Sequence, residues 1–375
     1  MSSKIRMVDL QNQYLRIKPE IDQAIQEVLN STAFIQGPQV NQFADALAHY
    51  LKTKAVIPCA NGTDALQIAM MALGLKPRDE IILPVFTYVA TAEVIALLGL
   101  TPVFIDVKHD TFTIDVDQLE SKITSKTKAI VPVHLFGQCA DMEEILHIAR
   151  KKNLFVIEDA AQSLGAVYTF SDGTKQKSGT IGILGTTSFF PSKNLGCFGD
   201  GGAVMTNDIT LAERVKMIAN HGQKVKYYHE SIGVNSRLDT LQAAILAVKL
   251  NYLPEYEDKR NKAATFYDQA LKKIPGIEIP FRSKQSTHGF HQYTLKASKR
   301  DSLKEYLERK GVPSMIYYPI PLHLQKAYRQ EKLQEGSFPI AEKLSKEVIS
   351  LPIHTEMKEE ELEFICQSIK EFYNG

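Results

Sequence analysis

The sequence predicts an α/β protein with a mainly parallel sheet in a large domain and a smaller α+β domain at the C-terminus. Short apolar runs alternate with segments of helical periodicity over the first two thirds of the chain. This alternation is typical of a parallel sheet that helices cover on both faces. Beyond Pro275 the pattern changes to short strands and helices. We therefore predict two domains, at residues 1–252 and 253–375.

The elements are expected in the following order. Two helices come first, at residues 19–30 and, after the break at Gly37 and Pro38, 40–51. Apolar runs predict strands at residues 55–58, 80–83, 102–107, 129–133, 154–157, 186–190 and 203–206. Helical periodicity lies between several of them, at 64–75, 91–98 and 142–151. Two further helices, 236–252 and 256–271, precede C-terminal elements at 290–295, 300–310 and 358–372.

Composition excludes several classes of partner. The 44 basic residues nearly balance the 43 acidic ones, which gives no electrostatic case for binding nucleic acid or an anionic membrane. No apolar run approaches the ~18 residues of a membrane span, and residues 1–6 lack the apolar stretch of a secretion signal. The four cysteines are scattered and form no CxxC pair. We expect a cytoplasmic protein with free thiols.

Polar clusters follow four of the predicted elements, at residues 61–64, 158–163, 188–196 and 233–237. Ligands of open α/β sheets bind beyond the C-terminal ends of the strands, so these clusters are the candidate site. In the first cluster, Gly62 frees the backbone at a helix N-terminus, where amides can hold a phosphate. Plain N-capping by Asn61 or Thr63 explains the same residues equally well.

Two charged residues of the other clusters suggest chemistry. Asp159 ends an apolar run, where its carboxylate can bond a protonated ring nitrogen or simply cap the next turn. Lys193 lies in a turn between two strands, where partial burial would lower its pKa and make the amine nucleophilic. Alone, such a lysine also fits a surface charge. The hydroxyl of Ser188 is close enough in sequence to add to an anion site.

An anion site, a strand-end carboxylate and a strand-end lysine together suit pyridoxal 5′-phosphate (PLP). Its phosphate needs backbone and hydroxyl donors, its aldehyde a lysine, and its pyridine nitrogen an acidic partner that keeps it charged. Other cofactors are disfavoured. The sequence contains no HxxxH pair beside a glutamate, so we predict no metal site, and no GxGxxG of a dinucleotide fold.

At these residues the chain resembles the DegT/DnrJ/StrS family of PLP-dependent sugar aminotransferases, which have the fold type I, aspartate aminotransferase-like architecture. The resemblance covers nearly the whole chain. It rests on six motifs in this order: CANGTDAL (59–66), FTYVAT (86–91), IEDAAQ (157–162), SFFPSK (188–193), GDGG (199–202) and NSR (235–237). The fold and activity of that family are accordingly expected here.

The resemblance implies a role for each residue that matches a motif. Lys193 matches the lysine that forms a Schiff base with PLP, and Asp159 matches the partner of the pyridine nitrogen. Gln162 matches a residue near the ring hydroxyl. Tyr88 occupies the position whose ring stacks on the cofactor, with Ala161 on its opposite face. Pyridoxamine 5′-phosphate is the expected form of the cofactor during turnover.

The remaining matches concern the phosphate and the subunit interface. Gly62, Thr63 and Ser188 match phosphate contacts. Asn235 matches a phosphate contact that reaches in from the other subunit, so the resemblance implies a homodimer with shared active sites. Arg237 lies two residues further, at the head of a predicted helix, and is our candidate for binding a substrate carboxylate. A structural ion pair at the interface is the alternative role.

The closest resemblance within the family is to aminotransferases that act on UDP-2-acetamido-2-deoxy-3-oxo-glucuronate. It implies glutamate as donor, 2-oxoglutarate as co-product, and a place in surface polysaccharide (lipopolysaccharide, O-antigen) biosynthesis. That group has a His-Tyr-Pro motif in its sugar site, where this chain has Tyr317-Tyr318-Pro319. We expect Tyr317 and Tyr318 to bind substrate. The changed residue leaves a dTDP-3-keto-6-deoxyhexose or a UDP-4-keto sugar open as the acceptor.

Two further classes are alternatives. One is a PLP-dependent sugar dehydratase on the same fold. Such relatives replace the lysine with histidine, so Lys193 argues against it. The other is a regulator that binds PLP without turnover.

Overall fold

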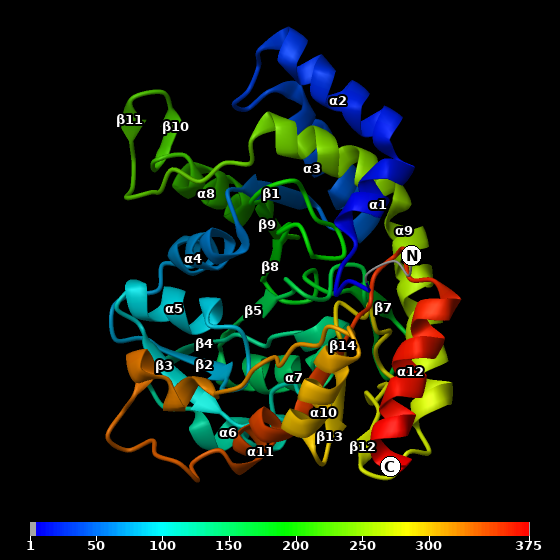
Figure 1. The fold of residues 1–375 in the computed structure, drawn as a ribbon. Coiled ribbons are helices and arrows are strands. Elements are labelled where there is room, and N and C mark those ends of the chain that lie inside the picture. Colours follow the sequence, from blue (N-terminus) through cyan, green and yellow to red (C-terminus); the bar gives the residue numbers. More distant parts are fainter. Residues whose placement is uncertain (1–4, 375) are drawn as a thin grey trace.

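The computed structural model describes residues 5–374, which form a large sheet enclosed by helices and a smaller C-terminal part (Figure 1). Residues 1–4, on which our expectation about a secretion signal partly rests, lie outside the described residues. Within residues 5–374, no helix combines the length and apolar character needed to cross a membrane. All four cysteines are free and buried.

The central sheet has seven strands in the order β1-β9-β8-β5-β4-β2-β3. Their bounds are β1 (Ala55–Cys59), β2 (Glu80–Pro84), β3 (Thr101–Ile105), β4 (Thr127–Ile130), β5 (Phe155–Asp159), β8 (Leu184–Ser188) and β9 (Gly202–Thr206). Strand β9 is antiparallel to β1 and β8, whereas the other neighbours are parallel. The mainly parallel α/β fold is confirmed, and a strand forms at each of the seven apolar runs.

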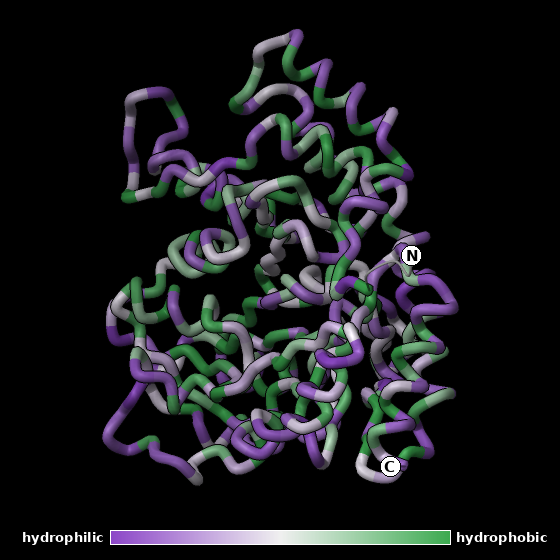
Figure 2. Tube along the Cα trace, in the orientation of Figure 1, coloured by the Kyte–Doolittle hydropathy of each residue, from purple (hydrophilic) through white to green (hydrophobic). Residues whose placement is uncertain are grey.

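Apolar clusters lie on both faces of this sheet. Along β2, Ile81 and Leu83 pack in one cluster while Ile82 packs in another, as the alternation of side chains on a strand requires. The helices before and between the strands are α1 (Leu10–Arg16), α2 (Lys18–Ser31), α3 (Pro38–Leu51), α4 (Gly62–Ala72), α5 (Ala90–Leu97), α6 (Leu119–Lys122), α7 (Met142–Lys152) and α8 (Ile209–Ala219). Polar and apolar residues alternate along the outer helices α2 and α12 (Glu359–Asn374), which rest on the core through one side (Figure 2).

A single long helix, α9 (Thr240–Leu271), replaces the two helices predicted at 236–252 and 256–271. The predicted break was wrong because the chain stays helical through Pro254, which lies inside α9. Proline in a helix interior costs about 3 kcal/mol. Leu253 and Tyr256 on either side are fully buried, and this packing offsets the cost.

The C-terminal part has its own sheet and core. Strands β12 (Ile277–Glu278), β13 (Tyr293–Ala297) and β14 (Val348–Leu351) pair antiparallel. Helices α10 (Arg300–Arg309), α11 (Pro339–Glu347) and α12 complete this part, and a separate apolar cluster joins it to the end of α9. The predicted boundary at residue 252 falls within α9, and the division into two domains stays a prediction.

Several short elements were not predicted. They include the hairpins β6 (Val167–Thr169) with β7 (Lys175–Lys177) and β10 (Gln223–Val225) with β11 (Tyr228–His229). Short 3-10 helices occur at Val116–Gln118, Leu135–Gly137, Leu322–Leu324 and Lys326–Tyr328. The β10–β11 hairpin projects from the body of the molecule (Figure 1).

Candidate active site

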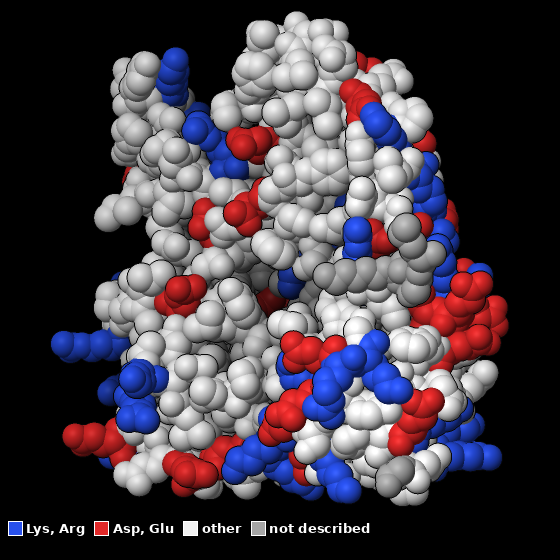
Figure 3. Space-filling view, viewed as in Figure 1, with Lys and Arg blue, Asp and Glu red and all other residues white. Residues whose placement is uncertain are grey.

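A cavity of about 670 Å³ lies beyond the C-terminal ends of β1, β5 and β8. The space-filling view shows a hollow near the centre of one face, with acidic and basic side chains inside it (Figure 3). Ten residues that the sequence indicated line this cavity: Gly62, Thr63, Tyr88, Asp159, Ala161, Gln162, Ser188, Lys193, Tyr317 and Tyr318. Among residues 5–374, no group of three or more His, Cys, Asp or Glu side chains is arranged to hold a metal ion.

One side of the cavity is built from the start of α4. The side chain of Asn61 accepts a hydrogen bond from the amide of Asp64 at 2.8 Å, so the N-capping role is present. The amides that precede this bond have no partner inside the helix. Gly62 approaches β8 so closely that a Cβ added to it would lie 2.7 Å from the Cβ of Ser188. Glycine is therefore required where the helix N-terminus meets the serine, and the two together offer amide and hydroxyl donors of the kind an anion cradle needs.

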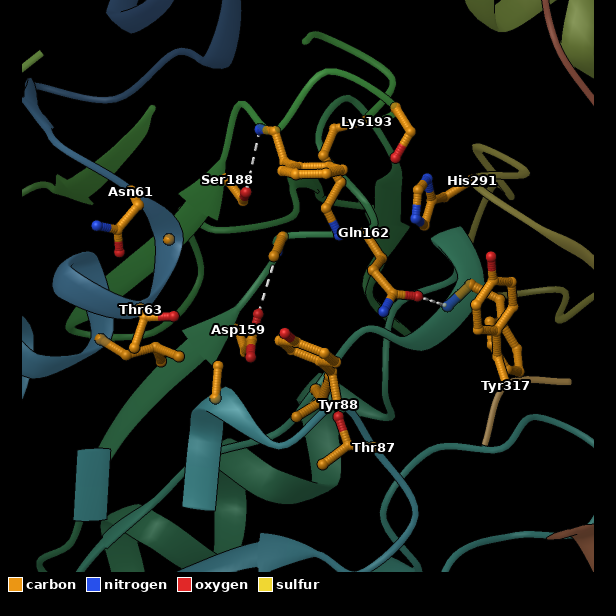
Figure 4. A pocket seen from close by; sticks show the side chains of 18 of the residues that line it. Asn61, Thr63, Thr87, Tyr88, Asp159, Gln162, Ser188, Lys193, His291 and Tyr317 are labelled. Carbon is orange, nitrogen blue, oxygen red and sulfur yellow. Dashed lines mark hydrogen bonds between the residues drawn. The ribbon is translucent and has the colours of Figure 1, made fainter. Parts of the chain in front are cut away.

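Asp159 is the last residue of β5, and its carboxylate faces the cavity (Figure 4). Its Oδ2 accepts a hydrogen bond from Thr91 Oγ1 at 2.8 Å, and its Oδ1 accepts one from the amide of Ala161 at 3.2 Å. The side chain of Asp159 thus caps the following turn and also faces the cavity, and its role toward a ring nitrogen stays a prediction.

The neighbouring Glu158 fixes this end of the strand from behind. Its buried carboxylate accepts hydrogen bonds from three amides in the segment 179–182, and it lies 2.9 Å from Nε2 of His134. Nδ1 of His134 accepts a hydrogen bond from the amide of Ala140. Nε2 therefore carries the ring proton and donates the hydrogen bond to Glu158. The amide of His134 also bonds the carbonyl of Asp159 at 3.0 Å. This network holds the backbone of Asp159 in place.

Lys193 projects into the middle of the cavity from the turn after β8 (Figure 4). Burial lowers the pKa of its amine to about 8, and the negative charge of Asp159 opposes part of that shift. The turn is held at two points. Asn194 Nδ2 donates to the carbonyl of Gly289 at 2.8 Å, and the buried ammonium of Lys249 donates to the carbonyl of Gly196.

Aromatic side chains and a glutamine close the side of the cavity opposite α4. Gln162 accepts a hydrogen bond from the amide of Phe136 at 2.9 Å and donates one to the hydroxyl of Tyr318 at 3.1 Å. The ring of Tyr318 lies 6.2 Å from that of Tyr88, and Tyr317 adjoins it. Burial raises the pKa of Tyr318, which keeps its hydroxyl protonated.

Two of the predicted site residues do not line the cavity of this single chain. Asn235 is exposed, and its backbone pairs with that of Asn220 in an isolated bridge. Arg237 is partly exposed and forms no ion pair with any residue in the range 5–374. Between them, Ser236 Oγ accepts a hydrogen bond from the amide of Ala60, and Asp239, which precedes α9, makes no side-chain cap.

The cavity also contains residues that sequence reasoning did not assign. Thr91, which supports Asp159, lies in the quoted FTYVAT motif, and that motif was its only signal. Thr87, His291 and Gln292 line the cavity as well. His291 and Gln292 come from the C-terminal part of the chain, more than 100 residues after Asp159, and no local pattern marks them.

Several known proteins are similar to this chain over nearly its whole length. A relative from Pseudomonas aeruginosa, UDP-2-acetamido-2-deoxy-3-oxo-D-glucuronate aminotransferase, is 47% identical over 97% of this chain and 99% of its own. A Geobacillus stearothermophilus relative named pleiotropic regulatory protein is 46% identical over 98% of both chains. The structure of NtdA from Bacillus subtilis with bound cofactor PMP is similar with a TM-score of 0.90 and 32% identity, covering all of this chain and 86% of that one. The model of the DegT/DnrJ/EryC1/StrS aminotransferase family matches residues 15–370. The chain therefore belongs to the DegT/DnrJ/EryC1/StrS aminotransferase family.

Proposed function

We propose that this aminotransferase uses PLP to move an amino group from glutamate to UDP-2-acetamido-2-deoxy-3-oxo-glucuronate, in the biosynthesis of a surface polysaccharide. The observation that carries the proposal is one cavity in which Lys193 and Asp159 converge beside the anion cradle of α4 and Ser188. The choice of sugar rests on the 47% identical relative that acts on this substrate.

The residues present fit PLP. The cradle at Gly62, Thr63 and Ser188 suits its phosphate, and the tight approach of Gly62 to Ser188 leaves no room for a side chain there. Asp159 offers a buried carboxylate for the ring nitrogen, and Lys193 an amine whose pKa is already lowered. The aminotransferases of this family depend on PLP, and the related NtdA was solved with PMP.

When bound, PLP supplies an electron sink for the substrate carbon and carries the amino group between the two substrates. The chain supplies the rest. Nζ of Lys193 takes up and returns the proton that moves during transfer, since its pKa of about 8 lies near physiological pH. Thr91 and the amide of Ala161 hold the carboxylate of Asp159 in a fixed orientation through two hydrogen bonds. Tyr317 and Tyr318 face the sugar.

A panel of UDP- and dTDP-linked keto sugars, each offered with glutamate, tests the proposal. We expect amination of the 3-oxo-glucuronate derivative at the highest kcat/KM. Preference for a dTDP-3-keto-6-deoxyhexose or a UDP-4-keto sugar would reassign the acceptor, as the replacement of histidine by Tyr317 allows. Release of 2-oxoglutarate without amination of any sugar would contradict the proposal.

A second candidate is a regulator that binds PLP without turnover, because one 46% identical relative is named a pleiotropic regulatory protein. The cavity favours an enzyme, because a protein that only binds PLP does not need Lys193 to have a lowered pKa beside the carboxylate of Asp159. The same assay separates the two. A regulator would bind PLP and show no change in cofactor absorbance when glutamate is added.

We further propose that the protein acts as a homodimer whose sites are shared, in the cytoplasm. The projecting β10–β11 hairpin and the segment after it present large apolar side chains to solvent, with Tyr227 78%, Tyr228 72% and Ile232 87% exposed. Such a patch is typical of an interaction surface. It lies just before Asn235, which is also exposed and does not reach its own cavity. In the proposed dimer, a second copy of the chain covers these exposed apolar side chains. Asn235 of each chain then lies at the partner's phosphate cradle.

Mixing two inactive variants tests the shared site. We expect Lys193→Ala and Asn235→Asp homodimers each to lose activity. Mixed heterodimers should regain up to about a quarter to a half of the wild-type rate per dimer, because one of the two sites then carries both lesions and the other carries none. Subunit exchange is monitored with differently tagged chains. Exchange without recovery of activity would indicate that each site is built within one chain.

Arg237 is the proposed carboxylate-binding residue, since it has no ion pair within the described chain. Arg237→Met is expected to weaken substrate binding by about 1.5–3 kcal/mol for each charged hydrogen bond lost. Arg237→Lys is the matched control, because it keeps the charge but not the two parallel bonds. The two half-reactions are followed separately by cofactor absorbance. A loss confined to the glutamate half-reaction would remove Arg237 as support for a uronate.

A further inference from the structure

His291 lies in a segment that the fold holds rigidly against the cavity wall, just before β13. Asn194, next to Lys193, bonds the carbonyl of Gly289 at 2.8 Å. The guanidinium of Arg260 bonds the carbonyl of Phe290 at 3.1 Å. The first contact fixes the backbone before His291 to the turn that carries the lysine, and the second fixes it to α9. The imidazole therefore has a defined place in the cavity, beside Lys193.

The ring of His291 is buried, with 7% of its surface exposed, yet its Nδ1 is a buried atom without a hydrogen-bond partner among residues 5–374. The other buried histidines described, His134, His323 and His354, each use at least one ring nitrogen. Leaving a buried polar group unpaired costs about 1–3 kcal/mol, so such exceptions need an explanation. In a residue that lines a substrate cavity, a bound molecule is the natural partner.

The surroundings of His291 determine what kind of partner fits. Burial lowers the pKa of its imidazole well below the ordinary value, and the positive charges of Lys193 and Arg260 lower it further. The ring is therefore neutral at physiological pH, with one N–H donor and one acceptor nitrogen. A neutral group with one donor and one acceptor complements a hydroxyl group, whereas a carboxylate binds more strongly to a positively charged group.

The position within the cavity indicates which molecule presents that hydroxyl. Figure 4 shows Asn61, Thr63 and Ser188 on one side of the cavity and His291 with Tyr317 on the other, with Lys193 between them. The phosphate cradle is thus remote from His291. The imidazole faces the region between the reactive amine and the aromatic residues assigned to the sugar.

We propose that His291 is a specificity-determining residue of the acceptor site, whose neutral imidazole hydrogen-bonds a sugar hydroxyl next to the carbon that receives the amino group. This role rests on the proposed function. Glutamate has no hydroxyl, so the imidazole distinguishes the two substrates that enter the same cavity. It serves the sugar half-reaction and contributes little to the glutamate half-reaction.

The test compares His291→Phe, which keeps a flat ring without nitrogens, with His291→Gln, which keeps a donor and an acceptor. We expect His291→Phe to lower kcat/KM for the keto sugar about 5-fold for each hydrogen bond lost. His291→Gln should restore part of the loss, and the glutamate half-reaction should change less than about 2-fold in both. His288→Asn is the control, because His288 is near in sequence but does not line the cavity, and asparagine can still accept the amide of Phe290.

A binding measurement gives a second readout that does not depend on turnover. In the Lys193→Ala background, calorimetry with the 3-amino product of UDP-2-acetamido-2-deoxy-3-oxo-glucuronate should show the same weakening for His291→Phe and none for His288→Asn. Equal losses of rate in both half-reactions, or unchanged sugar binding, would contradict the role of His291 and leave the proposed function intact. A wild-type enzyme that accepts amino groups from glutamate but aminates no sugar would overturn the proposed function, and this role with it.

Discussion

Replacing Lys193 with alanine is expected to abolish amino transfer and to remove the position at which borohydride fixes the cofactor to the chain. The structure presents this amine to the middle of the cavity, and burial lowers its pKa to about 8. Only the unprotonated amine is a nucleophile. Alanine supplies neither a nucleophile nor a proton carrier, whereas the cradle at Gly62 and Ser188 is unchanged, so the variant should still bind PLP.

The pH dependence of PLP addition follows from the same pKa. Burial disfavours the ammonium form, so about half of the Lys193 amines are unprotonated at pH 8, against roughly 0.4% for lysine at its ordinary pKa. The rate at which apoprotein takes up PLP should rise with pH and level off above about pH 8. A rate that continues to rise beyond pH 10 would mean that Lys193 behaves as a solvent-exposed lysine.

Peptide mapping after borohydride reduction provides the decisive control. The pKa of Lys249 is also lowered to about 8 by burial. Its ammonium, however, donates to the carbonyl of Gly196 and does not line the cavity. Geometry therefore predicts a label on Lys193 and none on Lys249. A label on Lys249, or on any other lysine, would remove the central assignment of the site.

The sequence predicted the convergence of Lys193 and Asp159 because both follow buried strands. Asp159 is the last residue of β5 and Lys193 lies in the turn that follows β8, and the C-terminal ends of parallel strands meet at one edge of a sheet. Their separation of 34 positions along the chain is immaterial once β5 and β8 are neighbours. The place of Gly62 at the same edge of the sheet was predictable for the same reason, since Gly62 follows β1.

Features that depend on packing between distant segments were not predictable. The local rule for Pro254 indicated a break, but the burial of Leu253 and Tyr256 keeps α9 continuous. His291 lies beside Lys193 only because Asn194 and Arg260 bond the backbone before it. These bonds link residues between 30 and 95 positions apart, and no periodicity or motif encodes them. Asn235 and Arg237 do not line the cavity of this chain, and the roles proposed for them require the second copy proposed above.

Asp159→Asn is expected to reduce turnover by at least about 100-fold, the scale of loss when an electrostatic group of an active site is removed. Asparagine keeps the size and can still accept the amide of Ala161, so the turn after β5 should persist. It carries no charge, and each pKa unit by which it fails to favour the protonated ring nitrogen is worth about 1.4 kcal/mol. Bound PLP, measured by absorbance after dialysis, should remain close to stoichiometric.

Thr91→Val separates the charge of Asp159 from its orientation. This variant removes the 2.8 Å hydrogen bond to Oδ2 and leaves the carboxyl group of Asp159 in place. We expect a smaller loss of turnover than in Asp159→Asn, with the same retention of PLP. The structure gives Asp159 two roles, capping the turn through Oδ1 and presenting a charge to the cavity, and only the second should affect chemistry. A near-normal rate for Asp159→Asn would show that the capping role is the only one, because asparagine preserves the cap while lacking the charge.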